Sequence, residues 1–437
     1  MRQRDIFWFW LPLFASWLLM TAEGPIISAA INRLPNEVIM LAAQGIVVSL
    51  SVTIESPVIN LLATSTALVK DRASFLLMRR FTVHWMVLLT AVSIAIAFTP
   101  LFDLVVGTWL GTPEAVAEWV RPGLKIMTFW SAAIAWRRFL QGVLIHFNQP
   151  RKMAWGTAVR LLTSGGTVIG LAAFTNLPGV VNGTTALMAG VVAEALYATY
   201  AIRPLLQNEL SETAVTDEAP LTYRDLIRFH LPLAGAAVMV LLVQPLVAFS
   251  LARLDRPTQT LAAWPVLFQI MLMARAAALA LPEAVIALSK GPESHQPIRR
   301  FCLVLAAIVG AGMLLFTFSP LARFYLFGVQ DMTAEVGNLA QSGLLYFLLL
   351  PSLTVIVMWL RGVLIYGRKT TAVNIAVVVN MAVTIVVLAV GLAGQWPGLP
   401  TAAIALTLAV LAEILYLSWR AQQFLPIFAT KMATRIF

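Results

Sequence analysis

The sequence is poor in charged residues and in the residue types that most protein chemistry requires. Only 11% of its 437 residues are charged, whereas a soluble globular domain carries about 25%. So little polar surface excludes an ordinary soluble protein. The single cysteine, Cys302, excludes an internal disulfide, and the four histidines are widely scattered along the chain. No metal-ligand spacing results, so we expect no bound metal.

The sequence also lacks the motifs of catalysis. It contains no phosphate-binding glycine loop, no convincing nucleophile with a base, and no pair of carboxylates tied to a reaction. We therefore expect that the chain is not an enzyme and needs no cofactor beyond a coupling proton or sodium ion. This absence disfavours a membrane scaffold or an intramembrane enzyme, which are the alternatives from another functional class.

Apolar residues dominate what is there. Hydrophobic residues make up 60% of the chain, and the mean hydropathy is +0.85. Apolar runs of at least 18 residues recur along the sequence, and each can cross roughly 30 Å of hydrocarbon as a helix. The fold class predicted is all-α integral membrane, with twelve spans near 6–30, 38–69, 81–108, 119–147, 153–174, 183–204, 225–251, 257–289, 301–328, 338–366, 371–394 and 400–420.

An internal repeat at an offset of 220 residues is the strongest signal. Residues 4–50 and 224–270 share 12 identical positions without a gap, starting with RDIFWFWLPL and RDLIRFHLPL. Shared apolar composition explains chance leucine matches, but not matched Pro, Arg-Arg and Glu in one register. Each half holds six spans, so the repeats are parallel, and substrate sites in such transporters lie between the halves. The register continues in RRF (79–81 and 299–301) and LQGVLIH/LRGVLIY (140–146 and 360–366), and AEALY/AEILY (193–197 and 412–416) follows at an offset of 219.

The repeat and the charge pattern predict the domain organisation and the orientation. We expect lobes at 1–205 and 224–424, a cytoplasmic linker at 206–223 and a cytoplasmic tail at 425–437. With the N-terminus inside, 19 lysines and arginines fall on the inner side and 6 on the outer side. This bias predicts a plasma (inner) membrane protein with both termini in the cytoplasm. The net charge of +10 thus reflects topology rather than a nucleic-acid partner, and we expect a monomer in the bilayer.

Ionisable residues inside spans are costly and tend to be functional. Glu194 and Glu413 share a repeat position, which suggests a structural task such as bonding a neighbouring helix. Without them the spans hold five arginines and three glutamates, a surplus of two positive charges. The surplus favours an anionic guest, because guanidinium binds carboxylate or phosphate through two hydrogen bonds. Snorkelling to the headgroups is the alternative for Arg160 and Arg361. The expected guest contacts are Arg137, Arg138, Gln141, Arg275, Arg361, Gln44 and Gln244.

Two carboxylates are candidates for ion coupling. Glu23 lies two residues before Pro25, and its repeat counterpart is Val243. A lone carboxylate beside a helix break suits a proton or sodium site, with helix packing as the alternative. Glu55 and Arg275 share one repeat position with opposite charge. They would form either a gate that opens in one state or a permanent ion pair.

Twelve spans in two parallel halves resemble the multidrug/oligosaccharidyl-lipid/polysaccharide (MOP) exporter superfamily, whose best-known branch is multidrug and toxic compound extrusion (MATE). SPVINLLATSTALVKDR (56–72) and the paired turns LQGVLIHFNQPRKMAW and LRGVLIYGRKTTAV also resemble the progressive ankylosis (ANKH) branch. Turns of this kind occur broadly in the superfamily. The superfamily resemblance covers nearly the whole chain and implies a MATE-like, V-shaped bundle whose two lobes rock between inward-open and outward-open states.

The ankylosis resemblance implies efflux of anions such as citrate, pyrophosphate and nucleotides, which agrees with the arginine surplus. We therefore expect a secondary active exporter of a small anionic solute, an organic carboxylate or a phosphate-containing compound. The alternatives are a proton- or sodium-coupled multidrug exporter and a flippase for an anionic lipid-linked substrate.

Overall fold

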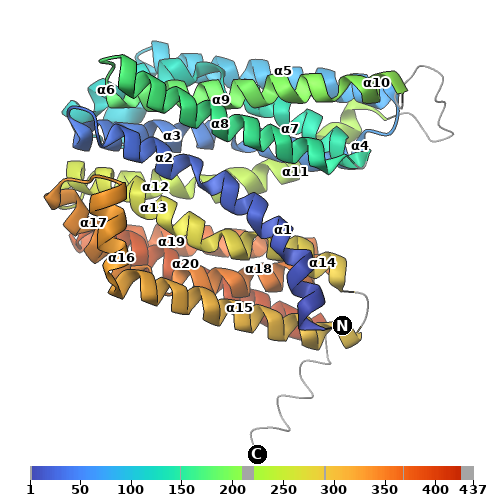
Figure 1. Ribbon diagram of the computed structural model, residues 1–437. Coiled ribbons are helices and arrows are strands. Elements are labelled where there is room, and N and C mark those ends of the chain that lie inside the picture. Colours follow the sequence, from blue (N-terminus) through green and yellow to red (C-terminus); the bar gives the residue numbers. More distant parts are fainter. Residues whose placement is uncertain (1, 148, 209–220, 290–291, 368, 425–437) are drawn as a thin grey trace, which may run out of the picture. The chain divides into compact units, whose positions relative to one another are not determined.

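The computed structural model describes residues 2–147, 149–208, 221–289, 292–367 and 369–424, and no strand occurs among them (Figure 1). Ten of the described helices are long and apolar enough to cross a membrane. The bent pair α17 (Ala334–Tyr346) and α18 (Leu350–Tyr366), with 48° between its helices, makes an eleventh. The prediction of an all-α integral membrane protein is confirmed. Most of the predicted linker and the whole predicted tail lie outside the described residues.

The predicted span at 119–147 is the one that does not meet the same length and hydropathy criteria. It falls on α6 (Glu114–Ile126), η2 (Met127–Phe129) and α7 (Trp130–His146). The α7 helix has only 17 residues and carries Arg137 and Arg138. In the repeat, this region corresponds to the bent pair α17 and α18, so the two halves share one architecture here.

The chain forms two compact units, and one contains residues 23–252 and 257–262. Within it α8 and α9 run side by side (Figure 1). A Cβ at Gly190 of α9 would lie 3.1 Å from the Arg160 backbone oxygen, so glycine permits this close approach. All the helices of this unit are α2 (Glu23–Ile31), α3 (Glu37–Ile59), α4 (Leu61–Leu68), α5 (Arg72–Phe98), η1 (Asp103–Trp109), α6, η2, α7, α8 (Pro150–Phe174), α9 (Gly179–Ala201), α10 (Arg203–Asn208), α11 (Tyr223–Leu241) and α12 (Val243–Leu251).

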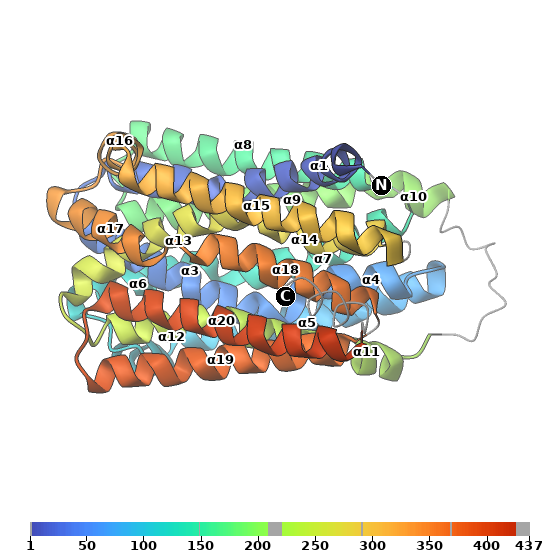
Figure 2. The same cartoon turned by 90° about the horizontal axis from the view of Figure 1, so that it is seen from below.

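The other unit contains residues 1–22, 253–256 and 263–437, described up to residue 424. Here α19 and α20 run side by side, as α8 and α9 do (Figures 1 and 2). Its helices are α1 (Gln3–Thr21), α13 (Pro257–Leu279, whose first turns belong to the first unit), α14 (Leu281–Leu288), α15 (Pro292–Phe318), α16 (Pro320–Arg323), η3 (Phe324–Val329), α17, α18, α19 (Thr370–Ala393) and α20 (Gly398–Phe424).

The units and the predicted lobes divide the chain differently. The first helix of each half packs against the other half, so α1 contacts α14 and α15 while α11 contacts α3. Side chains support both placements: the Trp10 indole nitrogen donates to the Ala277 carbonyl at 3.0 Å. The Asn60 amide donates to the Leu233 carbonyl at 2.8 Å. Buried apolar faces and these bonds attach α1 and α11 to their units.

Helix breaks repeat at the same offset of 220 residues. The first span is interrupted at Ala22, between α1 and α2, and its counterpart is interrupted at Leu242. The second span is interrupted at Asn60, three residues after Pro57, and its counterpart at Ala280. Pro57 lacks a backbone N–H and disturbs the preceding turn, although Ala277 at the equivalent position shows that proline is not required. The two halves thus share the positions of their helix breaks as well as part of their sequence.

Candidate functional site

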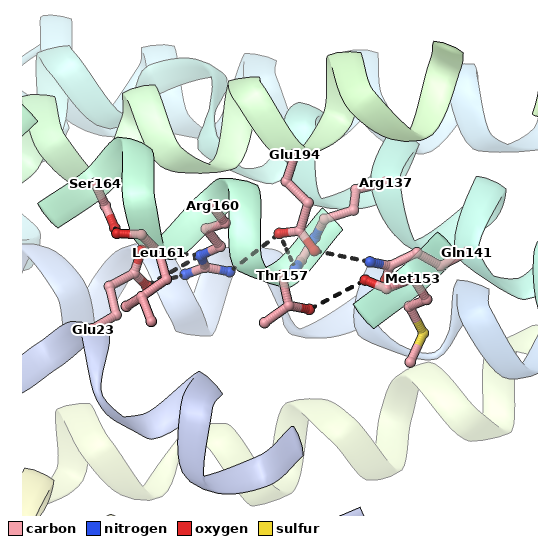
Figure 3. Close-up of polar contacts among 9 residues, drawn as sticks. All are labelled: Glu23, Arg137, Gln141, Met153, Thr157, Arg160, Leu161, Ser164 and Glu194. Carbon is pink, nitrogen blue, oxygen red and sulfur yellow. Dashed lines mark hydrogen bonds and ion pairs between the residues drawn. The ribbon is translucent and has the colours of Figure 1, made fainter. Parts of the chain in front are cut away.

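Glu194 on α9 lies at the centre of a buried polar cluster in the first unit (Figure 3). Its carboxylate accepts hydrogen bonds from Arg137 Nη1 at 2.5 Å and from Gln141 Nε2 at 2.9 Å. The two donors are four residues apart on α7 and therefore share a face. Glu194 is 0% and Arg137 4% exposed, so this ion pair is withdrawn from solvent.

Arg160 on α8 extends the cluster to α2. Its Nε lies 3.1 Å from both carboxylate oxygens of Glu23, and its Nη2 lies 2.5 Å from Oε2. Its Nη1 is 3.9 Å from Oε2 of Glu194. Figure 3 shows the guanidinium between the two carboxylates. The four charges thus form one network in the order Glu23, Arg160, Glu194, Arg137, with no net charge.

Glu413 on α20 is the centre of the corresponding cluster in the other unit. It accepts hydrogen bonds from Arg361 Nε on α18 at 2.7 Å and from Asn380 Nδ2 on α19 at 2.9 Å. Arg361 Nη2 is also 2.5 Å from Oε1 of Glu413. Both repeat-related glutamates therefore bond neighbouring helices, which agrees with the structural task suggested for them by the sequence.

The two clusters use the same repeat positions with exchanged residue types. Gln141 corresponds to Arg361, and Arg160 corresponds to Asn380, each at an offset of 220 residues. At these two positions each half provides one arginine and one amide to its glutamate, but from opposite helices. The exchange keeps the charge balanced around both glutamates.

The first unit adds one acid and one base that the second unit lacks. Glu23 and Arg137 are present where the second half has Val243 and Val357. Because Arg160 contacts both Glu23 and Glu194, it joins the added acid to the repeated glutamate. The added residues are complementary in charge, so they form an extension of the repeated cluster.

These pairs change the interpretation of the arginine surplus. The surplus arose because Glu194 and Glu413 were set aside, and both of them bind arginine. With these two glutamates included, the spans contain five arginines and five glutamates. The guanidinium groups of Arg160 and Arg361, the two candidates for snorkelling, are held by carboxylates.

Arg138 and Arg275 are the arginines that these clusters leave without a partner. Both are half-buried, and neither makes an ion pair or a hydrogen bond with the described residues. Arg138 follows Arg137 on α7 and interacts electrostatically with the charged residues of the Glu194 cluster. Arg275 lies on α13, where Arg361 and Glu413 are its charged neighbours. In each unit, one of these half-buried arginines is thus left without an ion pair or hydrogen bond among the described residues.

Glu55 on α3 is a buried carboxylate, 7% exposed, whose Oε2 has no hydrogen-bond partner among the described residues. The indole N–H of Trp130 on α7 is also buried and has no hydrogen-bond partner by strict geometry among the described residues. It lies near enough to Glu55 to be a hydrogen-bond donor to its carboxylate. Of the two predicted coupling residues, Glu23 is thus held by Arg160 while Glu55 keeps an open oxygen. Glu55 and Arg275 belong to different units, and their pairing stays a prediction.

Of the predicted glutamines, Gln141 belongs to the Glu194 cluster, and the other two lie on α3 and α12. Gln44 on α3 is buried with Oε1 unpartnered, and it packs against Gly183 of α9. Gln244 is half-buried near the start of α12. Sequence reasoning missed Asn380 and Trp130. Asn380 carried a usable signal, because it is a polar residue in an apolar helix at the repeat position of Arg160.

No protein-family model and no curated protein matches the sequence. Solved structures do match its fold. An inward-facing multidrug resistance MATE family transporter of the MOP superfamily is 14% identical, covers 94% of this chain and 95% of its own, and has a TM-score of 0.72.

Two further structures extend this likeness. The lipid II flippase MurJ, in an inward closed conformation, is 12% identical, with 94% of this chain and 87% of the other covered and a TM-score of 0.74. A MOP superfamily transporter from Pyrococcus furiosus is 14% identical, with 97% and 96% covered and a TM-score of 0.64. The MATE-like fold predicted from the repeat is confirmed.

Proposed function

We propose that this chain is a secondary active exporter of a small anionic solute, an organic carboxylate or a phosphate-containing compound, working by alternating access between its two lobes. The observation that carries the proposal is the pair Arg138 and Arg275, which lie on α7 and α13 and make no ion pair or hydrogen bond with the described residues. Intramembrane arginine without a partner is expensive and marks substrate paths. A carboxylate or phosphate offers the two oxygens that guanidinium binds best.

The other arginines and the glutamine predicted as guest contacts have a structural role in this proposal. Arg137 and Gln141 are engaged by Glu194, and Arg361 is engaged by Glu413. An anion would have to displace a buried carboxylate to bind them. We therefore assign them to positioning α7 and α18, and assign the anion contacts to Arg138 and Arg275.

Ion coupling is assigned to Glu55 rather than to Glu23. Two hydrogen bonds from Arg160 Nε and one from Nη2 occupy the oxygens of Glu23, so a proton or a sodium ion would have to displace a guanidinium there. Glu55 Oε2 has no such competitor. A proton or sodium ion bound at Glu55 would carry one positive charge beside Trp130 and Arg138. In this proposal both termini are cytoplasmic.

Relatives in fold support transport without deciding the substrate. The Pyrococcus furiosus transporter has a binding pocket of reverse polarity that suggests a different function. Likeness to the lipid II flippase favours a second candidate, translocation of an anionic lipid-linked molecule. The same two arginines would bind its phosphate. Membership of the ankylosis branch stays a prediction.

Transport assays in proteoliposomes test the proposal. Radiolabelled citrate and pyrophosphate are compared with a fluorescent cationic dye and with a fluorescent lipid-linked diphosphate. Anion flux that depends on a proton or sodium gradient supports the proposal. Dye efflux without anion flux refutes it in favour of a multidrug exporter, and lipid translocation alone refutes it in favour of a flippase.

Variants connect the flux to the arginines. Arg138→Gln and Arg275→Gln should each raise the half-saturating anion concentration about tenfold to a hundredfold, the effect of losing a charged hydrogen-bond donor. Both variants should fold normally, because no carboxylate loses its partner. Arg79→Gln is the matched control, since Arg79 is exposed on α5 and its loss should leave the flux unchanged. Unchanged kinetics in both test variants would remove these residues from the site.

A further inference from the structure

His230 on α11 is a fully buried titratable residue that the proposed function does not use. Its ring is 0% exposed and lies edge-on to Phe81 and Trp85, with ring centroids 5.4 and 5.7 Å away. Its Nδ1 lies 2.8 Å from the hydroxyl oxygen of Thr64 on α4. The contact holds the first helix of the second half against the break between α3 and α4.

The hydrogen-bond partners around His230 suit both of its protonation states. Thr64 Oγ1 lies 3.0 Å from the carbonyl of Asn60 as well as 2.8 Å from His230 Nδ1. The backbone carbonyl of Pro57 lies beside the ring as a second acceptor. Nε2 makes no hydrogen bond with the described residues.

In the neutral ring, the Thr64 hydroxyl donates to Nδ1 and the ring proton is on Nε2. In the imidazolium, the hydroxyl turns to donate to the Asn60 carbonyl and its oxygen accepts from Nδ1–H. Adding a proton at Nδ1 therefore requires the rotation of one hydroxyl. Burying a charge is unfavourable, and the charge-assisted hydrogen bond from Nδ1–H to Thr64 offsets part of that cost.

The other half of the chain has a corresponding contact that contains no titratable group. Trp10 occupies the repeat position of His230, and its indole N–H donates to the Ala277 carbonyl at 3.0 Å. Ala277 is the counterpart of Pro57. Ala280 and Ala284 stand at the positions of Asn60 and Thr64, and both belong to the apolar cluster that contains Trp10. The indole cannot take up a proton, and no hydroxyl is beside it.

The two halves thus differ at two contacting positions together. One has tryptophan with alanine, and the other has histidine with threonine. A ring that only filled space would not need the hydroxyl. From this coordinated difference we propose that His230 is a proton-binding site at the contact that docks α11 on α3 and α4. The proposal does not depend on the transported substrate.

No carboxylate pairs with His230 among the described residues, so a proton does not have to compete with an ion pair there. The elements packed against α11 are α3, α4, α5 and α12, and the last three carry no acid. The titratable groups on these elements and on α11 itself are Glu37 and Glu55 (α3), Arg72, Arg79, Arg80 and His84 (α5), and Tyr223, Arg224, Asp225 and Arg228 (α11).

Nuclear magnetic resonance of the full chain, labelled with ¹⁵N at its four histidines, tests the proposal directly. The His230 signals are those that disappear in His230→Trp, which copies the other half. We expect one protonated and one unprotonated ring nitrogen at high pH, and loss of the unprotonated signal at low pH. A ring that keeps its unprotonated nitrogen down to the lowest pH at which circular dichroism shows intact helices overturns the proposal.

Variants at position 64 separate proton binding from simple packing. Thr64→Ser keeps the hydroxyl and should keep the transition, whereas Thr64→Ala copies Ala284 and should abolish it within the folded range. These conservative changes also keep the test valid if His230→Trp fails to fold. An unaltered transition in Thr64→Ala would show that the hydroxyl does not support the proton, contrary to the proposal.

The other half provides a gain-of-site control. Trp10→His alone places an imidazole beside the Ala277 carbonyl without a hydroxyl, and we expect it to remain neutral. Trp10→His with Ala284→Thr rebuilds the arrangement found at His230, and a second titrating imidazole should appear. Equal behaviour of the single and the double variant would contradict the role assigned to the hydroxyl.

Discussion

The added ion pair of the first half can be removed by copying the second half. Glu23→Val and Arg137→Val introduce the residues of positions 243 and 357, singly and together. Each single variant unbalances the cluster. Without Arg137, one guanidinium remains for two carboxylates, and without Glu23, two guanidinium groups remain for one carboxylate. The double variant restores neutrality and leaves Arg160 free to pair fully with Glu194, as one arginine does with Glu413.

Burial sets the expected magnitudes. Arg137 and Glu194 have side chains 5% and 0% exposed, so Arg137→Val should destabilise the fold by about 3–5 kcal/mol, the cost of an uncompensated buried charge. Arg160 and Glu23 are 17% and 10% exposed, so Glu23→Val should cost less, about 2 kcal/mol. The double variant should be more stable than the sum of the singles by about 2–3 kcal/mol. Lost packing cancels in this cycle because it contributes equally to the singles and the double.

Unfolding in detergent, followed by the fluorescence of the 13 tryptophans, measures the four proteins. The double variant should melt above Arg137→Val although it lacks one more native residue. Glu23 and Arg137 make no contact with each other, so their coupling must pass through Arg160 and Glu194. Additive destabilisation, with the double variant melting below both singles, would refute the network.

Further predictions concern packing and helix attachment. Gly142→Ala should destabilise strongly, since its Cβ would lie 2.3 Å from the Leu62 carbonyl oxygen, whereas Gly166→Ala meets nothing within 4 Å and should stabilise its exposed helix position by about 0.5–1 kcal/mol; thermal melting distinguishes the two. Trp10→Phe should cost about 1–3 kcal/mol, because the buried Ala277 carbonyl loses its donor. Faster hydrogen exchange in α1 would report this loss, and unchanged exchange would contradict it.

Repeat comparison predicted part of the site and missed part of it. Glu194 and Glu413 were recognised because identical ionisable residues at one repeat position imply a repeated task. Their partners were not recognised as partners, because Arg160 and Asn380 share a position but not a residue type. Comparing positions by polarity instead of identity would have found Asn380. The reciprocal exchange with Gln141 is visible only when the contacts to both glutamates are known.

For the arginines, too, the sequence predicted only part of what the structure shows. The sequence treated five intramembrane arginines alike, and three of them proved to be held by carboxylates. Arg137 and Arg138 are adjacent in the chain, yet successive residues on a helix point about 100° apart. One therefore enters the buried cluster and the other does not. Only the packing of α7 against α9 selects between them.

The sequence by itself determined the helical membrane fold and the two-fold repeat. Apolar length and a fixed offset are local properties that can be read along one chain. The tertiary structure decided which charges neutralise one another and which helix belongs to which unit. Arg137 and Glu194 are 57 residues apart, and Trp10 bonds a carbonyl 267 residues away. Such pairings depend on helices meeting in space, and no local pattern encodes that geometry.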